Sequence, residues 1–335
     1  MKPFVIAEIG QAHDGSLGAI HSFIDALSVT GIDAVKFQTH IAEAESSHLE
    51  PFRINFSFED KTRYDYWKRM EFSLDQWVEI KNHCNDKNLE FISAPFSVTA
   101  VNLLEKEGVK KYKIGSGEVN NFLMLDKIAK TGKEIILSSG MSSFEELDKV
   151  FQFLKPYKNK LSVLQCTTQY PTKAENIGLN VIAELKKRYK VPVGLSDHSG
   201  KIYPSIAATA LGAEILEFHA VFDRRQFGPD SKSSLEIDEI KTLVEGVNYI
   251  SSSLQNYINK NDNSNFKDLK RIFEKSLAVN KDLKTGHILT VDDLESKKPN
   301  NKGVSTNQFK EIIGRKINKN LKKWNFLNYT DISNE

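Results

Sequence analysis

The chain has few cysteines, no long apolar run and almost no net charge. Its 335 residues include only two cysteines, Cys84 and Cys166, which are too few for a disulfide framework and are not spaced as a metal-binding pair. No apolar stretch approaches the ~18 residues that a membrane-spanning helix needs. Lysine and arginine (46) nearly balance aspartate and glutamate (44), so bulk charge gives no reason to expect a nucleic-acid or membrane partner.

These absences favour a globular protein of the cytoplasm. The N-terminal sequence MKPFVIAE enters a strand-like run almost at once, which does not read as a targeting segment. We therefore expect both cysteines to be reduced thiols. Hydrophobic residues make up 40% of the chain, which is ample for a large core.

Short apolar runs of strand length alternate with helical segments through most of the chain. The predicted strands are 4–9, 34–38, 91–94, 111–114, 134–138, 161–166, 193–196 and 214–218. The predicted helices include 17–29, 74–87, 144–153, 179–190, 205–211 and 237–254. Eight strand–helix units in roughly 255 residues predict an α/β fold of the (β/α)8 TIM-barrel type. A doubly wound sheet is the alternative, but no Gly-x-Gly-x-x-Gly opens a helix after the first strand.

Two stretches depart from this alternation. Residues 39–72 are rich in charged and aromatic side chains and predict an extended loop with room for one short helix, and loops of that length usually have a function. Residues 255–270 turn polar around an asparagine-rich centre, which is typical of a linker. Beyond it, short strands and tight turns predict a small β-rich module with a thin core. The predicted domains are a barrel (1–258), a linker (259–274) and a C-terminal module (275–335).

Two histidines end two successive predicted strands. His198 follows the run VPVGLS and His219 follows AEILEF, each after a carboxylate one or two residues earlier. Neighbouring parallel strands of a barrel end on the same rim, so the two rings would lie about one strand spacing apart and could hold a divalent metal. An ordinary polar residue at a strand end is the plain alternative for either histidine alone. The same arrangement at the ends of two successive strands favours a pair of metal ligands.

Other polar residues fall where a barrel places its chemistry, at the carboxyl ends of the strands. Glu8 ends the first strand, and Lys36 and Gln38 share one face of the second. Lys113 precedes a glycine-rich turn whose amides could cradle a phosphate. A lone lysine on a strand is more often a solvated charge. Together, the lysines, hydroxyls and glycine turns predict a phosphorylated anionic substrate, and the histidines and carboxylates predict a metal and acid–base chemistry.

The same residues carry a resemblance to a known family. The motifs AEIGQAHDG, VKFQTH, FISAPFS, YKIGSGE, ILSSGM, CTTQYPT, GLSDH, ALGAEILEFH and GPDSKSSL resemble, in this order, those of the sialic acid synthases. That resemblance implies condensation of phosphoenolpyruvate with an N-acetylated hexose to give a nine-carbon sugar acid, such as N-acetylneuraminate, legionaminate or pseudaminate. The segment LKTGHILTVDDLESKKP resembles the antifreeze-protein-like (SAF) domain of the same family, which implies a homodimer in which each tail reaches over the partner's barrel.

The resemblance also implies roles for individual residues. His198 and His219 would hold a divalent metal, manganese first, with magnesium or cobalt as alternatives. The phosphoenolpyruvate ligands would be Lys36, Gln38, Lys113, Ser116, Ser138 and Ser196. The sugar ligands would be Tyr170, Glu217, Asp230 and Lys298, and the catalytic carboxylates would be Glu8 and Glu118.

Two positions depart from the family pattern. Lys298 stands where relatives usually have an arginine, and Thr168 stands where they often have an asparagine. A lysine offers a point charge in place of a planar donor, and a threonine donates only one hydrogen bond. The aldose is left open between N-acetylmannosamine, its 6-phosphate and a 2,4-diacetamido-6-deoxyhexose. The alternative functions are a pyruvate-dependent aldolase or lyase of the same fold and a non-catalytic relative that binds a sugar acid.

Overall fold

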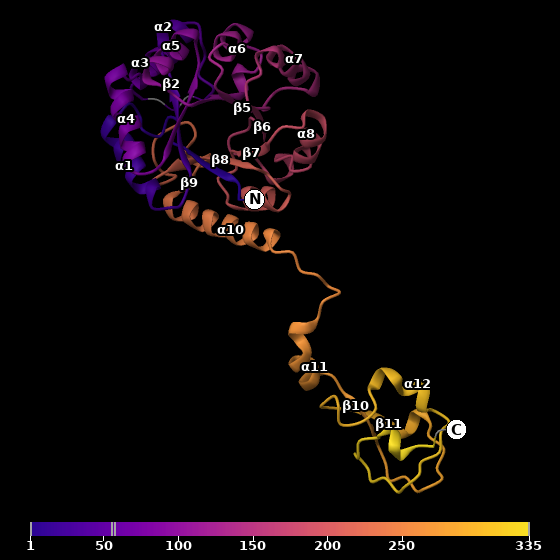
Figure 1. The fold of residues 1–335 in the computed structure, drawn as a ribbon. Helices are drawn as coiled ribbons and strands as arrows, with labels where there is room; N and C mark the ends of the chain where they lie inside the picture. The colour runs from indigo at the N-terminus through magenta and orange to yellow at the C-terminus, as the bar shows by residue number, and fades with distance from the viewer. Residues whose placement is uncertain (1, 55, 57, 334–335) are drawn as a thin grey trace. The chain divides into compact units, whose positions relative to one another are not determined.

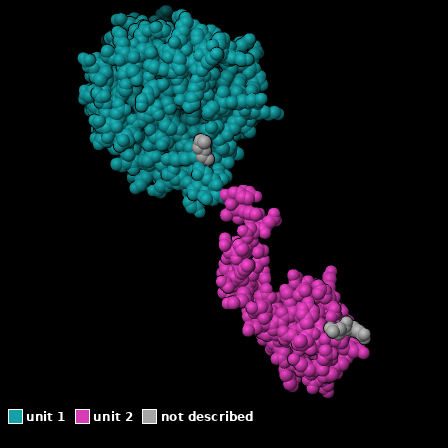
Figure 2. All heavy atoms as spheres, viewed as in Figure 1, with its two compact units in different colours: residues 1–256 teal, residues 257–335 magenta. Residues whose placement is uncertain are grey.

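The computed structural model of the chain describes residues 2–54, 56 and 58–333. The chain forms two compact units, residues 1–256 and 257–335, each with its own core (Figures 1 and 2). Across the described ranges, no helix combines the length and the apolar character needed to cross a membrane.

The first unit is a closed barrel of eight parallel strands, which confirms the predicted fold class (Figure 1). Its strands are β1 (Phe4–Glu8), β2 (Ala34–Thr39), β3 (Glu90–Pro95), β4 (Lys111–Ile114), β5 (Glu134–Ser138), β6 (Leu161–Cys166), β7 (Val193–Asp197) and β8 (Ile215–Val221). The barrel closes because β1 pairs with both β2 and β8. A two-residue strand, β9 (Leu235–Glu236), pairs in parallel with the end of β8.

Helices surround the sheet. They are α1 (Leu17–Ser28), α4 (Leu74–Asp86), α5 (Val98–Glu107), α6 (Phe122–Ala129), α7 (Phe144–Leu154), α8 (Val181–Tyr189), α9 (Tyr203–Ala210) and α10 (Ile237–Gln255). Several start sharply because a serine side chain accepts a hydrogen bond from a backbone amide of the first turn, as Ser73 does for α4 and Ser143 does for α7.

The inside of the barrel is filled in layers. Apolar side chains block its lower part: Ile6, Ala34, Ile92, Ile136, Leu164 and Ile215. Gly194 belongs to this part, where a Cβ atom would lie only 2.1 Å from the carbonyl oxygen of Ile215. Because strand side chains alternate with a period of two, the next inward residue on most strands is polar, as with Glu8 after Ile6 and Glu217 after Ile215. The barrel thus presents a polar layer above an apolar plug.

The segment predicted as a loop with room for one short helix contains two, α2 (Ala42–Glu45) and α3 (Arg63–Met70). The prediction was wrong because the apolar face of α3 is short and lies among charged residues. Its members Tyr66, Trp67 and Met70 are buried against Ala42 in a small core of their own. The segment is therefore a structured cover over one side of the barrel end.

The second unit contains α11 (Lys267–Phe273), β10 (Ser276–Val279), β11 (Leu294–Lys297) and α12 (Phe309–Ile312). Short elements with a small core agree with the predicted β-rich module. The predicted linker, 259–274, is not wholly irregular, because it includes α11. That helix buries none of its residues and is mostly charged, so no amphipathic pattern marked it.

The second unit contains two similar capped turns. Asp293 caps the turn that starts at Thr290, and Asp331 caps the turn that starts at Asn328. Each carboxylate is almost fully buried and pairs with a lysine ammonium, at 2.7 Å for Asp293 and 2.5 Å for Asp331. The unit therefore depends on two buried carboxylates in equivalent positions.

Candidate active site

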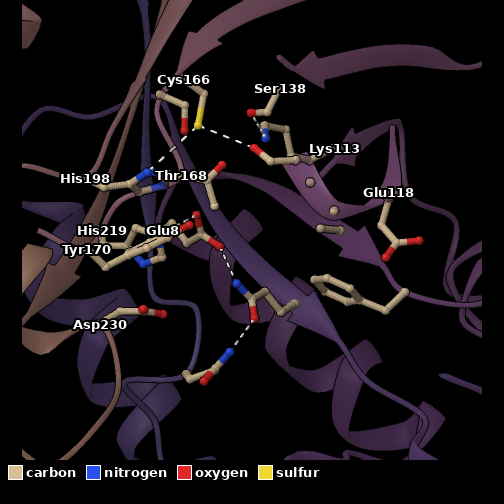
Figure 3. A pocket seen from close by; sticks show the side chains of 18 of the residues that line it. Glu8, Lys113, Glu118, Ser138, Cys166, Thr168, Tyr170, His198, His219 and Asp230 are labelled. Carbon is tan, nitrogen blue, oxygen red and sulfur yellow. Dashed lines mark hydrogen bonds and ion pairs between the residues drawn. The ribbon is translucent and has the colours of Figure 1, made fainter. Parts of the chain in front are cut away.

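A cavity of about 400 Å³ opens at the carboxyl ends of the barrel strands (Figure 3). Every site residue that the sequence predicted within the barrel lines it: Glu8, Lys36, Gln38, Lys113, Ser116, Glu118, Ser138, Tyr170, Ser196, His198, Glu217, His219 and Asp230. Lys298 belongs to the second unit, where its ammonium lies 5.1 Å from the ring centre of Phe273.

Four buried charges form the cavity's deepest layer, and we call Glu8, Lys36, Lys113 and Glu217 the floor quartet. The Lys36 ammonium lies 2.8 Å from Glu8 and 3.2 Å from Glu217, and the Lys113 ammonium lies 3.2 Å from Glu217. Register explains the contacts, since Glu8 lies beside Lys36 on the adjacent strand. Two positive and two negative charges thus neutralise one another in a place that is almost closed to water.

The pKa values of the quartet follow from this arrangement. Burial favours the neutral carboxylic acid, but the neighbouring His219 and Lys36 outweigh it and hold the pKa of Glu8 well below its usual range. Burial likewise disfavours the ammonium of Lys36, but Glu217 and Glu8 raise its pKa. For Lys113 burial dominates, and Lys36 adds repulsion, so its pKa is lowered. Lys113 is therefore the easier of the two lysines to deprotonate.

Hydroxyl groups surround the quartet, and two polar atoms remain without a partner. Lys113 donates to the Ser138 hydroxyl (2.6 Å), and the Ser196 hydroxyl donates to Oε1 of Glu217 (2.9 Å). Oε2 of Glu217 and the hydroxyl oxygen of Thr168 are buried, and neither has a hydrogen-bond partner among the described residues. Since buried polar groups are usually paired, both atoms are positioned to bond a bound molecule.

The histidine pair forms one wall. The ring centres of His198 and His219 lie 5.3 Å apart, and both rings are buried. Nδ1 of His198 lies 3.0 Å from the Thr167 carbonyl oxygen, which fixes the ring and leaves Nε2 as a ligand atom. Burial lowers the pKa of His219, favouring the neutral imidazole that binds metals.

A metal ion at this wall would have few protein ligands. Within the described part of the chain, no group of three or more histidine, cysteine, aspartate or glutamate side chains is arranged to hold an ion. Burial lowers the pKa of His198, but the Cys166 sulfur 3.8 Å from Nδ1 more than offsets it and raises that pKa to about 9, so a bound cation would replace a proton. Two imidazole nitrogens fit a divalent ion whose other ligands are water and substrate oxygens.

A chain of hydrogen bonds holds Glu8 from the side of α2. The Gln38 amide donates to Oε1 of Glu8 (2.8 Å), so its own oxygen faces Nε2 of His40 (3.1 Å). Nδ1 of His40 lies 2.6 Å from the Glu45 carboxylate. His40 therefore links Gln38 to the Glu45 carboxylate through its two ring nitrogens. The ring is stacked between Trp67 and Phe96, at 4.0 and 4.6 Å.

Glu118 and Ser116 lie on the turn after β4. Figure 3 shows Glu118 apart from the two histidines. Burial raises the pKa of Glu118, although Asn121 donates to its carboxylate (2.7 Å). Ser116 approaches the next loop closely, because a Cβ atom on Gly140 would lie 2.0 Å from the Ser116 side chain. Gly140 thus lets two loops meet beside the floor quartet.

The outer part of the cavity includes an arginine that sequence reasoning missed. Arg53, between α2 and α3, donates to Asp230 (2.6 Å), and its guanidinium carbon lies 4.2 Å from the ring centre of Tyr170. Trp67 and Phe96 were also missed as lining residues. The only signal in the sequence was the unusual length and aromatic content of residues 39–72, which does not say which side chain reaches the site.

Comparisons with known proteins agree with this geometry. The NeuB family matches residues 23–259, and the SAF domain matches residues 274–323. The chain is 34% identical to the N,N'-diacetyllegionaminic acid synthase of Campylobacter jejuni, over 96% of this chain and 98% of the relative. It is 33% identical to the human N-acetylneuraminate-9-phosphate synthase, over 94% of this chain and 88% of the relative. A crystal structure of the N-acetylneuraminic acid (sialic acid) synthetase from Leptospira borgpetersenii, in complex with citrate, superposes with a TM-score of 0.71 at 30% identity, covering 81% of this chain and 91% of that one.

Proposed function

The chain belongs to the NeuB family of sugar-acid synthases, and from this we propose that it condenses phosphoenolpyruvate with an N-acetylated hexose to give a nine-carbon sialic-acid-type sugar acid and phosphate. The observation that carries the proposal is the floor quartet beside the histidine pair. It places two buried ammonium groups next to a wall that suits a divalent ion. The two free thiols fit a reducing compartment, so we place the reaction in the cytoplasm.

The quartet binds the anionic substrate. Lys36 and Lys113 offset the charge of the carboxylate and phosphate of phosphoenolpyruvate, and hydroxyls of Ser116, Ser138 and Ser196 with the Gln38 amide complete the hydrogen bonds. Both ammonium groups already contact Glu217. Binding therefore exchanges a carboxylate partner for the substrate, and the unpartnered Oε2 of Glu217 remains to accept a hydrogen bond from the sugar.

The carbon–carbon bond forms between C3 of phosphoenolpyruvate and the aldehyde carbon of the sugar. When bound by His198 and His219, a divalent ion, manganese first and magnesium or cobalt as alternatives, supplies Lewis-acid polarisation of the aldehyde oxygen. Glu8 orients His219 through the contact at 3.3 Å. Glu118, with its raised pKa, accepts a proton from the water that adds at C2, and the C2–oxygen bond to phosphate then breaks.

The sugar occupies the outer part of the cavity. Tyr170 and Asp230 contact it there, and we propose that Lys298 from the tail of a partner chain completes the contact in a domain-swapped homodimer. This proposal rests on the small core of the second unit and on the polar segment before it, which allows the tail to reach another molecule.

Phosphate release tests the function. The purified chain with phosphoenolpyruvate, an N-acetylated aldose and Mn²⁺ should release phosphate, and a chelator should stop it until metal is restored. The pyruvate-dependent alternative requires a lysine Schiff base. The raised pKa of Lys36 opposes it there, whereas Lys113 needs a direct test. Borohydride with pyruvate should label neither lysine, and labelling of Lys113 would overturn the proposed function.

A further inference from the structure

A line of hydrogen bonds connects helix α3 with Glu8 on the cavity floor. The Tyr66 hydroxyl on α3 donates to the side-chain oxygen of Gln11 (2.9 Å). The Gln11 amide donates to the side-chain oxygen of Gln38 (3.2 Å), and the Gln38 amide donates to Oε1 of Glu8 (2.8 Å). We call these four residues, Tyr66, Gln11, Gln38 and Glu8, the Tyr66 chain.

The direction of each bond is set from the Glu8 end. Glu8 pairs with the Lys36 ammonium at 2.8 Å and is a carboxylate, which can only accept hydrogen bonds. A carboxamide has one donating end and one accepting end, so Gln38 turns its oxygen to Gln11, and Gln11 turns its oxygen to Tyr66. Burial raises the pKa of Tyr66, which keeps its phenol protonated. The Tyr66 hydroxyl is therefore the donor on which the order of the chain depends.

The cavity end of the Tyr66 chain also holds His219. Oε2 of Glu8 lies 3.3 Å from Nε2 of His219. Gln11 follows Gly10, whose φ of +53° brings the loop after β1 against the same ring, because a Cβ atom on Gly10 would lie 3.3 Å from Nδ1 of His219. The His219 ring is thus contacted by one member of the chain and by the loop that carries another.

Tyr66 itself lies outside the main cavity. It is almost fully buried, and its ring packs against Phe56 and Trp67, at 5.0 and 5.2 Å between ring centres. Gln11 lines the main cavity, whereas Tyr66 does not. The Tyr66 hydroxyl therefore reaches the site through Gln11, and its ring belongs to the small core of α3.

Building on the proposed function, we propose that Tyr66 is a positioning residue whose hydroxyl keeps the Tyr66 chain in one arrangement and so orients Glu8 and His219. The sugar aldehyde must be held firmly while the carbon–carbon bond forms, so a loosened His219 lowers kcat. Phosphoenolpyruvate is bound mainly by the ammonium groups of Lys36 and Lys113, so its KM depends little on the chain. The segment 39–72 thus supports the reaction from behind the cavity wall.

The experiment replaces Tyr66 by phenylalanine, which removes the hydroxyl and keeps the ring. Phosphate release is followed with Mn²⁺, each substrate being varied in turn, and with the N-acetylated aldose that the unaltered chain uses best. In Tyr66→Phe, kcat should fall about three- to tenfold, the value of one neutral hydrogen bond, while both KM values change less than about twofold. An unchanged kcat, or a loss that appears in KM alone, would overturn the proposal.

A double-variant cycle identifies the route of the effect. Gln11→Leu breaks the Tyr66 chain at its next member. In that background, Tyr66→Phe should lower kcat by less than about 1.5-fold further, because the bond it removes no longer leads to Glu8. Losses that multiply in full would show that Tyr66 acts by another route, such as general stability, and would overturn its positioning role.

Tyr64→Phe is the matched control. Tyr64 lies on the same helix and its ring contacts His48 (4.5 Å), but it takes no part in the Tyr66 chain and does not line the main cavity. Its kcat and KM values should equal those of the unaltered chain. An equal fall of kcat in Tyr64→Phe and Tyr66→Phe would overturn this proposal alone, whereas an unaltered chain that releases no phosphate would overturn the proposed function and this proposal with it.

Discussion

Burying a lysine ammonium inside a barrel costs free energy unless the charge is paired and hydrogen-bonded, and Lys113 is such a buried lysine. It contacts Glu217 and Ser138 in a place where burial already lowers its pKa. Lys113→Ala should raise the KM for phosphoenolpyruvate at least tenfold and that for the sugar much less, because one substrate alone loses a bond of about 1.5–3 kcal/mol. Initial rates with each substrate varied in turn would measure this.

The matched control is Lys111→Ala. Lys111 faces the same side of the same strand but lies at its amino end, away from the cavity, where it contacts Glu90 at 3.2 Å. Both KM values should stay unchanged in that variant. Equal changes for the two substrates in Lys113→Ala would contradict the assignment of Lys113 to phosphoenolpyruvate.

His40 acts on the reaction only through Gln38 and Glu8, so we regard it as a positioning residue. His40→Phe keeps an aromatic ring between Trp67 and Phe96 but removes both hydrogen bonds. We expect kcat to fall several-fold with little change in either KM, because only Gln11, at 3.2 Å, then holds the Gln38 oxygen and the amide that donates to Glu8 is less firmly oriented. Steady-state kinetics beside a thermal unfolding curve would separate this effect from lost stability.

The double variant His40→Phe/Glu45→Leu also removes the carboxylate that His40→Phe leaves unpaired. If the fall in kcat came only from that buried charge, the double variant would regain full activity, and the positioning role would be refuted.

Strand packing inside the barrel leaves β7 no room for a side chain at Gly194. A Cβ atom there would lie 2.1 Å from the Ile215 carbonyl oxygen and 2.7 Å from a methyl carbon of Leu164. Gly194→Ala should therefore destabilise the barrel by about 2 kcal/mol or more, as overpacking does. Urea unfolding would measure the loss. Gly18→Ala in α1, where the nearest atom is an ordinary 3.8 Å away, should be neutral or slightly stabilising, and an equal loss there would contradict the steric argument.

The strands and the residues at their carboxyl ends were predictable from the sequence. Strand side chains alternate between the two faces of the sheet, and apolar residues fill the lower part of the barrel, so the polar residues that follow them can only face its open end. Once the barrel was inferred, Glu8, Lys36 and Glu217 could only face the lumen near its open end. Arg53 could not be found this way, because its partner Asp230 is 177 positions away in the chain and no periodicity links them. For a related reason only one short helix was predicted in residues 39–72, since the apolar face of α3 is completed by tertiary contacts.

The assembly proposed above makes a prediction about mixtures of inactive chains. His198→Ala should be inactive through its barrel, and Lys298→Ala should be impaired through its tail. In a mixed dimer, one site would combine an intact barrel with an intact tail, so mixing the two should restore activity. Phosphate release after mixing and re-equilibration would measure it. A mixture that stays inactive although mixed dimers form would show that each tail serves its own barrel or none.

The second unit should be sensitive to acid. Burial opposes ionisation of Asp293 and Asp331, but Lys281 and Lys319 respectively, with capping hydrogen bonds, hold the pKa of each below its usual range. A lowered folded-state pKa contributes stability above the unfolded pKa of about 4, and that stability is lost as pH falls through the folded value. The isolated residues 257–335 should thus keep a constant urea midpoint near neutral pH and lose it below about pH 4. Asp293→Asn should reduce this pH dependence, and an unchanged profile would contradict the role of Asp293.

The pairing of β1 with β8 also sets an order of events while the chain is being made. The ribosome releases Glu8 and Lys36 long before Glu217, although Ile6 and Glu217 end as neighbours on adjacent strands. Until β8 arrives, Lys113 lacks the carboxylate it pairs with, and the growing sheet has two open edges that can pair with other chains. The last strand then completes the hydrogen bonding and the charge balance together, so a nascent chain stalled just before β8 has both open sheet edges that favour aggregation and a lysine without its partner.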